Sequence, residues 1–259
     1  MMDRPDRLHC YTIGHAKYPL DVFLYFLGCF GINCVVDVRS VPYSRSNPQY
    51  NRENLQDALH GHHIEYKSRG DRLGGRYTSP NLLFPDGTVN YKKVSELPAF
   101  QEGIVELISL LQRGKRIALM CSEKEPARCH RFALVARHLQ KRGVVVEHIR
   151  PGITTQSHQD LEQELMHAYL AAGQTTITDS SPDALDALYE RINRKIAYKA
   201  AQSGASQQDA YYDRRFRTAL EIRNSMMGGP AEGVEPDDAS RIGGNTGSRG
   251  RHKGQQILF

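Results

Sequence analysis

The stretch RIALMCSEKEPARCHRFALVARH at residues 116–138 decides the fold. It begins with an apolar run at residues 117–120, which has the length of a buried strand. A polar segment that contains Pro126 follows, and from Phe132 apolar residues return at the spacing of a helix. This order predicts a strand, a polar loop and an amphipathic helix. In an open parallel sheet the end of such a strand and the start of such a helix face one crevice, so this loop is the leading candidate for an active site.

The segments around this stretch repeat the alternation of strand and helix. We therefore predict an α/β fold with a mostly parallel sheet flanked by helices, in a domain that spans residues 1–152. Strands are expected at residues 9–14, 32–38, 64–66 and 144–149, and helices at 20–30, 52–60 and within 91–114.

The remaining residues divide into three parts by composition. Residues 153–225 are predicted to form a helical extension, with helices at 160–171, 182–201 and 208–223. The basic faces of the second and third of these helices could contact nucleic-acid phosphates or simply be solvated. Residues 226–254 have too few large apolar side chains to offset the entropy of ordering, so a disordered tether is expected. Residues 255–259 form a short apolar peptide that fits a groove on another protein.

Composition limits the setting in which the chain works. A formal net charge of +5 is compatible with a polyanionic partner. The five cysteines are odd in number, and no N-terminal signal-peptide pattern is present, so a reducing cytoplasmic location is predicted. No apolar stretch approaches the ~20 residues of a membrane span, so no membrane association is expected.

Charged residues at the ends of two predicted strands suggest acid–base chemistry. Asp37 and Arg39 share one face of a core strand because side chains alternate across it. Glu123 follows the central strand, and His15 and His130 are expected nearby. Two carboxylates in different environments can act as acid and base at an N-glycosidic or phosphodiester bond. The alternative is a buried ion network that only fixes the order of the strands.

Arginines and glycines suggest a phosphate-binding surface. Residues 67–80, KSRGDRLGGRYTSP, are predicted to be a mobile loop in which glycines let backbone amides approach a ligand and arginines donate to phosphate. A solvated basic loop is the alternative. The residues proposed for substrate or phosphate binding are Arg39, Ser44, Arg45, Tyr66, Arg69, Arg72, Gly74, Gly75, Arg76 and Arg131.

Two cysteines offer a competing chemistry. Cys129 is predicted at a helix N-terminus, and Cys121 ends a strand, as the nucleophile does in sulfurtransferases and cysteine phosphatases. Arg128 comes one residue later than in the phosphatase pattern, and Glu123 would repel an anion. Cys121, Cys129 and His130 could also supply three metal ligands, but Cys-x7-Cys-His is not a usual zinc spacing. No metal and no cofactor are therefore predicted.

Several spaced blocks in the first 150 or so residues agree in order with a known family. They are residues 12–15 (TIGH), 37–39 (DVR) with Pro42 and Ser44, Tyr66 with 73–75 (LGG), 121–123 (CSE), 129–131 (CHR) and 148–149 (HI). On these blocks the chain resembles a widespread bacterial family known as domain of unknown function 488. The resemblance implies an α/β fold and brings little established chemistry. Ser122 stands where the family often has alanine, and Ala16 where a serine is expected.

The last five residues carry a second resemblance. Gln255, Leu258 and Phe259 are similar to the peptide by which bacterial repair and replication proteins bind the DNA sliding clamp. The resemblance implies that Gln255 makes polar contacts beside the groove, while Leu258 and Phe259 fill its apolar pocket.

These observations lead to one main hypothesis and two alternatives. The main hypothesis is an enzyme that hydrolyses or transfers at an N-glycosidic or phosphodiester bond of DNA or a nucleotide, recruited to the sliding clamp in DNA repair or replication. The first alternative is a non-catalytic nucleic-acid-binding adaptor with a clamp-binding tail. The second is a cysteine-dependent sulfurtransferase.

Overall fold

The computed structural model describes residues 7–171 and 182–200. The predicted helix at 208–223, the tether at 226–254 and the peptide at 255–259 lie outside the described residues.

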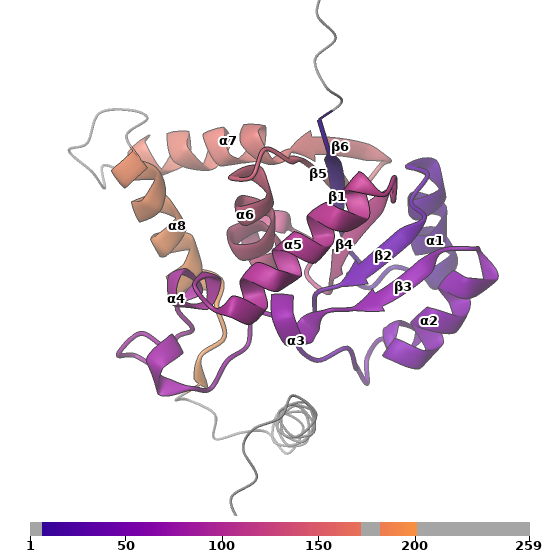
Figure 1. Ribbon diagram of the computed structural model, residues 1–259, viewed down its shortest axis with the longest axis horizontal. Helices are drawn as coiled ribbons and strands as arrows, with labels where there is room; N and C mark the ends of the chain where they lie inside the picture. Colours follow the sequence, from indigo (N-terminus) through magenta and orange to yellow (C-terminus); the bar gives the residue numbers. More distant parts are fainter. Residues whose placement is uncertain (1–6, 172–181, 201–259) are drawn as a thin grey trace, which may run out of the picture. The chain divides into compact units, whose positions relative to one another are not determined.

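A six-stranded sheet forms the centre of the described chain (Figure 1). The strand order is β3-β2-β4-β1-β5-β6, and all neighbouring strands are parallel except β5 and β6. This confirms the predicted α/β fold with a mostly parallel sheet. The strands are β1 (His9–Gly14), β2 (Cys34–Asp37), β3 (Glu65–Ser68), β4 (Ile117–Cys121), β5 (Val145–Arg150) and β6 (Thr154–Ser157).

Helices cover both faces of the sheet. On one face α1 (Leu20–Cys29) and α2 (Arg52–Gly61) pack in a cluster that contains Val35 and Met120. On the other face α5 (Pro98–Gln112) and α6 (Arg137–Gln140) pack in a cluster that contains Val36. Adjacent residues of one strand therefore serve opposite cores, which explains why β2 and β4 are apolar along almost their whole length.

Two C-terminal helices extend the second core. Leu161 of α7 (His158–Ala171) and Tyr189 of α8 (Pro182–Ile196) are buried in it. The Asn193 side chain accepts a hydrogen bond from the backbone N–H of Tyr91, at the start of α4 (Tyr91–Ser95), at 2.8 Å. After α8 the chain runs back beside residues 87–89, where Tyr198 O accepts from the N–H of Val89 at 2.9 Å. The predicted helix at 182–201 therefore ends earlier than expected, because its last residues pair with another segment.

The segment at 67–80 differs from the predicted mobile loop. It contains the end of β3 and a short helix, α3 (Gly70–Leu73), whose Leu73 is fully buried. Arg69 donates to Glu106 of α5 at 2.8 and 2.5 Å, and an Arg72 nitrogen lies 3.7 Å from the same carboxylate. Arg69 and Arg72, which were expected to bind phosphate, instead fasten this segment to α5, whereas Arg76 makes no such pair within the described residues.

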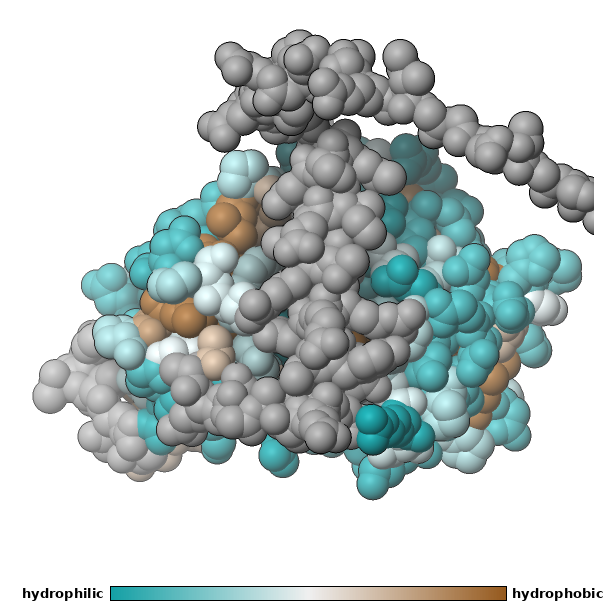
Figure 2. Space-filling model, turned by 90° about the horizontal axis from the view of Figure 1, so that it is seen from below, coloured by the Kyte–Doolittle hydropathy of each residue, from teal (hydrophilic) through white to brown (hydrophobic). Residues whose placement is uncertain are grey.

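The described helices can be compared with a membrane span in length and in apolar character. None of the helices within 7–171 and 182–200 combines the length and the apolar character needed to cross a bilayer. The described surface visible in Figure 2 is mainly hydrophilic, and its hydrophobic patches are separate from one another.

Candidate active site

A cavity of about 220 Å³ lies beyond the C-terminal ends of β2 and β4. This is the edge of a parallel sheet where ligands collect, and it is the edge predicted from residues 116–138. The side chains that line it come from five separate segments. They include Arg39 and Ser40 after β2, Gly75 and Arg76, Tyr91, the residues Cys121, Ser122, Glu123, Arg128, Cys129 and His130, and Ile196 and Tyr198 after α8.

The loop after β4 is held from two sides. Gly14 ends β1 so close to this loop that a Cβ there would lie 2.0 Å from the carbonyl oxygen of Glu123. The Arg131 guanidinium is fully buried and donates to the carbonyl oxygens of Glu123 at 2.5 Å and Lys124 at 2.9 Å. The backbone at Glu123 is therefore fixed, and the Glu123 side chain reaches the cavity from a rigid base.

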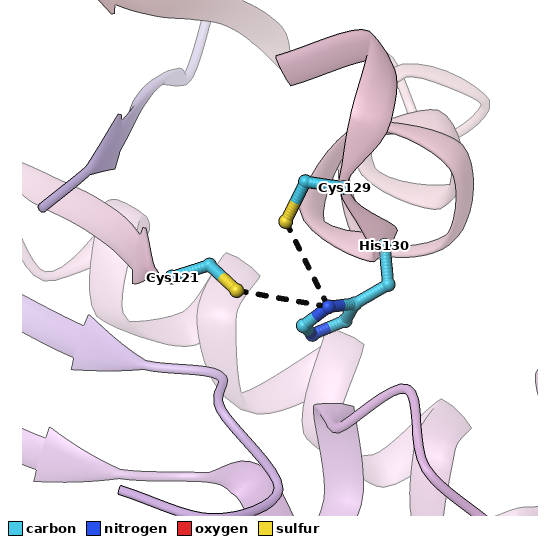
Figure 3. A group of neighbouring side chains, drawn as sticks. All are labelled: Cys121, Cys129 and His130. Atoms are coloured by element: carbon cyan, nitrogen blue, oxygen red, sulfur yellow. Dashed lines mark hydrogen bonds between the residues drawn. The ribbon is translucent and has the colours of Figure 1, made fainter. Parts of the chain in front are cut away.

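Cys121, Cys129 and His130 form a compact cluster on the cavity wall (Figure 3). Cys121 is the last residue of β4, whereas Cys129 and His130 begin the helical segment that continues through the π-helix Arg131–Ala136 into α6. Each sulfur lies 3.8 Å from Nδ1 of His130. The short 3₁₀ turn Pro126–Arg128 brings the two cysteines together although seven residues separate them.

The hydrogen bond on the other side of the His130 ring determines which nitrogen carries the proton. Nε2 lies 2.9 Å from the carbonyl oxygen of Val38, and a carbonyl only accepts, so Nε2 carries the hydrogen. In the neutral ring Nδ1 then presents its lone pair to the two thiols. Gly75 leaves room for the ring, because a Cβ at that position would lie 2.8 Å from Cγ of His130.

The two thiols differ in acidity. The hydrogen bond from Cys129, followed by the nearby His130 and Arg131, holds the pKa of Cys121 well below its usual range. Burial, followed by the hydrogen bond to Cys121, raises the pKa of Cys129 well above its usual range. Cys121 is therefore the more acidic thiol of the pair. These three side chains also hold ligand atoms within 4.8 Å of one another, close enough to share a metal ion.

Asp37 does not line the cavity. Its carboxylate is fully buried and accepts from Arg39 Nε at 2.9 Å, from an Arg39 terminal nitrogen at 2.6 Å and from the Tyr66 hydroxyl at 2.8 Å. The predicted pairing of Asp37 with Arg39 is present, as an ion pair behind the cavity wall. Asp37 and Glu123 do not flank one pocket as expected, because Arg39 lines the cavity and Asp37 does not.

His15 also lies behind Arg39. It is 2% exposed, stacks on Tyr50 with ring centres 4.0 Å apart, and its Nε2 lies 3.2 Å from an Arg39 nitrogen. Burial and the Arg39 charge lower the pKa of His15 to about 4, so the ring stays neutral and accepts from the guanidinium. His15 therefore positions Arg39.

The residues predicted to bind phosphate fall into two groups. Arg39, Gly75 and Arg76 line the cavity, and Gly74 packs against Ser40 next to it. The others do not line it. The Tyr66 hydroxyl donates to Asp37, while Arg69 and Arg72 pair with Glu106 of α5. The Ser44 hydroxyl accepts from the N–H of Asn47, and Arg131 donates to the backbone of the loop after β4. Arg45 is exposed.

Arg128 is a cavity residue that was not among the predicted phosphate-binding positions. Both Arg128 and Arg76 are exposed, and neither is paired with a carboxylate in the part of the chain that the structure describes. The Arg76 guanidinium lies over the Tyr198 ring at 5.3 Å from its centre. Tyr198 carried no sequence signal for the site, because it reaches the cavity only through the backward turn of the chain after α8.

Comparison with known proteins gives one match. Residues 20–138 match the model of the DUF488 family, a domain of unknown function. The DUF488 match supports the domain family expected from the sequence blocks, and it includes Asp37, Arg39, Glu123 and the Cys121–Cys129–His130 cluster. No curated protein and no solved structure matches the chain.

The DUF488 segment thus supplies most of the cavity wall, and the arrangement offers three kinds of chemistry. Exposed guanidinium groups can bind an anion. Glu123 can accept a proton, and the cluster of two sulfurs and one imidazole can act as a nucleophile or hold a metal.

Proposed function

We propose that the cavity is the active site of an enzyme that hydrolyses or transfers at an N-glycosidic or phosphodiester bond of DNA or a nucleotide. The supporting observation is that Arg76 and Arg128, which pair with no carboxylate among the described residues, line the same small cavity as Glu123 and His130. Two free guanidinium groups suit a phosphate, which they can bind through two donors each. A carboxylate on the same wall suits proton transfer to or from the bond that reacts.

In this proposal one carboxylate, and not a pair, transfers the proton. Glu123 alone handles the proton. In hydrolysis it takes a proton from water as the water oxygen bonds to phosphorus or to the sugar carbon. The leaving group takes the electron pair of the broken bond, and Glu123 gives up its proton to that group. Asp37 holds Arg39 against the cavity instead. Loss of the Glu123 carboxylate should therefore slow turnover and leave binding intact.

The proposed phosphate binding can be tested with variants that each lose one arginine. Arg128→Ala and Arg76→Ala should each weaken binding of a nucleoside monophosphate and of a short single-stranded oligonucleotide about 10-fold, measured by calorimetric titration. Arg113→Ala, an exposed arginine at the end of α5, removes the same charge and is the control. Equal weakening in all three variants would mean that only net charge matters and would sink the proposal.

The catalytic half is tested by Glu123→Gln. We expect turnover of an oligonucleotide or nucleotide substrate to fall ~100-fold or more with little change in affinity. If DNA binding and cellular resistance to DNA damage both survive this substitution unchanged, the chain is an adaptor. A persulfide mass shift on Cys121 of the purified chain would support sulfur transfer in place of hydrolysis.

We also propose that Gln255, Leu258 and Phe259 bind the DNA sliding clamp in the bacterial cytoplasm. The support is the order of a glutamine and an aliphatic–aromatic pair in the sequence, and the five free cysteines fit a reducing compartment. Deletion of residues 255–259 should abolish co-elution with the clamp and leave the melting temperature unchanged. Co-elution that persists after the deletion would remove the link to replication.

A further inference from the structure

We propose that Cys121, Cys129 and His130 hold a zinc ion whose fourth position opens into the cavity. The two Sγ atoms and Nδ1 of His130 lie within 4.8 Å of one another, and each sulfur is 3.8 Å from Nδ1. In a tetrahedral site with Zn–S near 2.3 Å and Zn–N near 2.0 Å, sulfur and nitrogen are about 3.5 Å apart. Each sulfur therefore needs to approach Nδ1 by only a few tenths of an ångström. The two sulfurs, which lie within 4.8 Å of each other, would come to about 3.8 Å apart on the ion.

The His130 ring is already oriented as a ligand. Its Nε2–H donates to the carbonyl oxygen of Val38, which fixes the ring and leaves the Nδ1 lone pair facing the sulfurs. A backbone carbonyl in this role is a usual second partner of a zinc-bound histidine. Gly75 leaves the space that the ring occupies, because a Cβ at that position would lie 2.8 Å from Cγ of His130.

The charge and the type of the ligands favour zinc. Two thiolates balance the charge of Zn²⁺, so a loaded site adds no net charge beside the buried Arg131 guanidinium. Thiolate and imidazole ligands select zinc over Mg²⁺, Ca²⁺ and Mn²⁺, which prefer oxygen. The spacing of seven residues argued against a site in the sequence, but the 3₁₀ turn at Pro126–Arg128 closes that gap in space.

Three protein ligands and one open position are typical of a catalytic zinc. The open side lies on the cavity wall with Glu123, so a zinc-bound water would have a carboxylate nearby to take its proton. This part rests on the proposed hydrolytic function and supplies the water activation that Asp37 cannot. The binding of the metal does not depend on that function.

The test measures metal in the full-length chain. Protein purified without chelators should contain one zinc per chain by elemental analysis, and replacement by Co²⁺ should give a near-ultraviolet band from thiolate-to-cobalt charge transfer. Cys121→Ser and His130→Asn should each lose the metal and the band. Cys29→Ser is the matched control, because Cys29 is an exposed thiol outside the cluster, and it should keep both.

Folding of each variant is checked by circular dichroism, and the half-buried His130→Asn serves if Cys121→Ser does not fold. The proposal is overturned if the wild-type chain takes up no zinc from a zinc-containing buffer, or if His130→Asn retains as much as the wild type. Rapid alkylation of Cys121 in the presence of zinc would also overturn it. Bound zinc without any nucleotide affinity would leave the metal site standing and refute the proposed function.

Discussion

A carboxylate serves in proton transfer only when an oxygen lone pair is free to meet the substrate. Both oxygens of Asp37 are engaged by Arg39 and Tyr66, and the group is 0% exposed. Glu123, by contrast, lines the cavity, and within the described residues its carboxylate accepts a single 3.3 Å hydrogen bond, from the N–H of Glu125. At the scale of single residues, the alternation of side chains along β2 predicted that Asp37 and Arg39 point together, but it could not show which of them faces solvent.

Loss of the Asp37 carboxylate should therefore act on stability. Asp37→Ala leaves the 6% exposed Arg39 without its partner, and we expect the free energy of unfolding in urea to fall by about 3–5 kcal/mol. Glu190→Ala, which breaks an exposed ion pair with Arg194 on α8, should cost about 0.5 kcal/mol or less. Comparable losses for the two variants would contradict the structural role of Asp37.

Gly75 should be intolerant of a single methyl group. In Gly75→Ala the new Cβ would meet Cγ and Cβ of His130 at 2.8 and 2.9 Å, so the ring must move. We expect affinity for Co²⁺ to fall about 10-fold or more, since displacement of a ligand costs affinity even when the fold survives. Gly28→Ala lies in α1 with nothing within 4 Å and should bind Co²⁺ like the wild type. An unchanged Gly75→Ala variant would refute this packing.

At the scale of elements, buried segments were predictable and exposed ones were not. The apolar runs of β2 and β4 fixed their positions to within two residues, because both strands are buried on both faces. The edge strand β6 has the sequence TTQS and no apolar signal, and it joins the sheet only through pairing with β5. The helix α3 was missed for a related reason: Leu73, which is buried against α5, is the one apolar residue in its four-residue sequence GDRL.

A buried chain of hydrogen bonds connects the sheet to α7 and α8. The Tyr189 hydroxyl donates to Glu162 at 2.6 Å, so it accepts from Nε2 of His158 at 2.8 Å. Nδ1 of His158 then accepts from Nε2 of His148 at 3.2 Å, and Nδ1 of His148 accepts from the Thr12 hydroxyl at 2.8 Å. Because Glu162 can only accept, it determines the direction of every hydrogen bond in this series. In that arrangement each imidazole carries a single proton and is neutral.

This series of hydrogen bonds predicts that the packing of α7 and α8 is sensitive to acid. Burial, followed by the Arg137 charge, lowers the pKa of His158 to about 3, and burial lowers that of His148. Below a pH of about 6.5 these histidines bind protons in the unfolded protein but not in the folded protein. The free energy of unfolding therefore falls as the pH drops from about 6.5 toward about 3. Each histidine should contribute up to about 1.4 kcal/mol per pH unit to that loss.

Urea unfolding of wild type and His158→Gln at about pH 7 and about pH 5 isolates one contribution. The variant should be less stable at the higher pH but should lose about 2 kcal/mol less between the two values, because residue 158 of the variant takes up no proton on unfolding. Parallel losses in the two proteins would show that His158 is not held neutral by the fold.

At the scale of the whole molecule, the cavity depends on segments that are distant in sequence. Residues 116–138 predicted the edge of the sheet at which it lies, but Tyr198 reaches it only because residues 198–200 pair with 87–89. The Cys121–Cys129–His130 cluster depends in the same way on the whole fold, since its parts belong to β4 and to the helix start, and Val38 after β2 holds the ring. A metal bound to this cluster would therefore link β4, the helix start and, through the His130 ring, the end of β2.

Zinc should therefore stabilise the entire described domain. A ligand that binds only the folded state adds about 2.7 kcal/mol at a free concentration ~100 times its dissociation constant. We expect the melting temperature of the wild type and of Cys29→Ser to rise with zinc and to fall again with a chelator. His130→Asn should melt at one temperature under all three conditions, because Nδ1 of His130 is the atom that both sulfurs approach. A zinc-dependent rise in His130→Asn equal to that of the wild type would place the ion elsewhere on the chain.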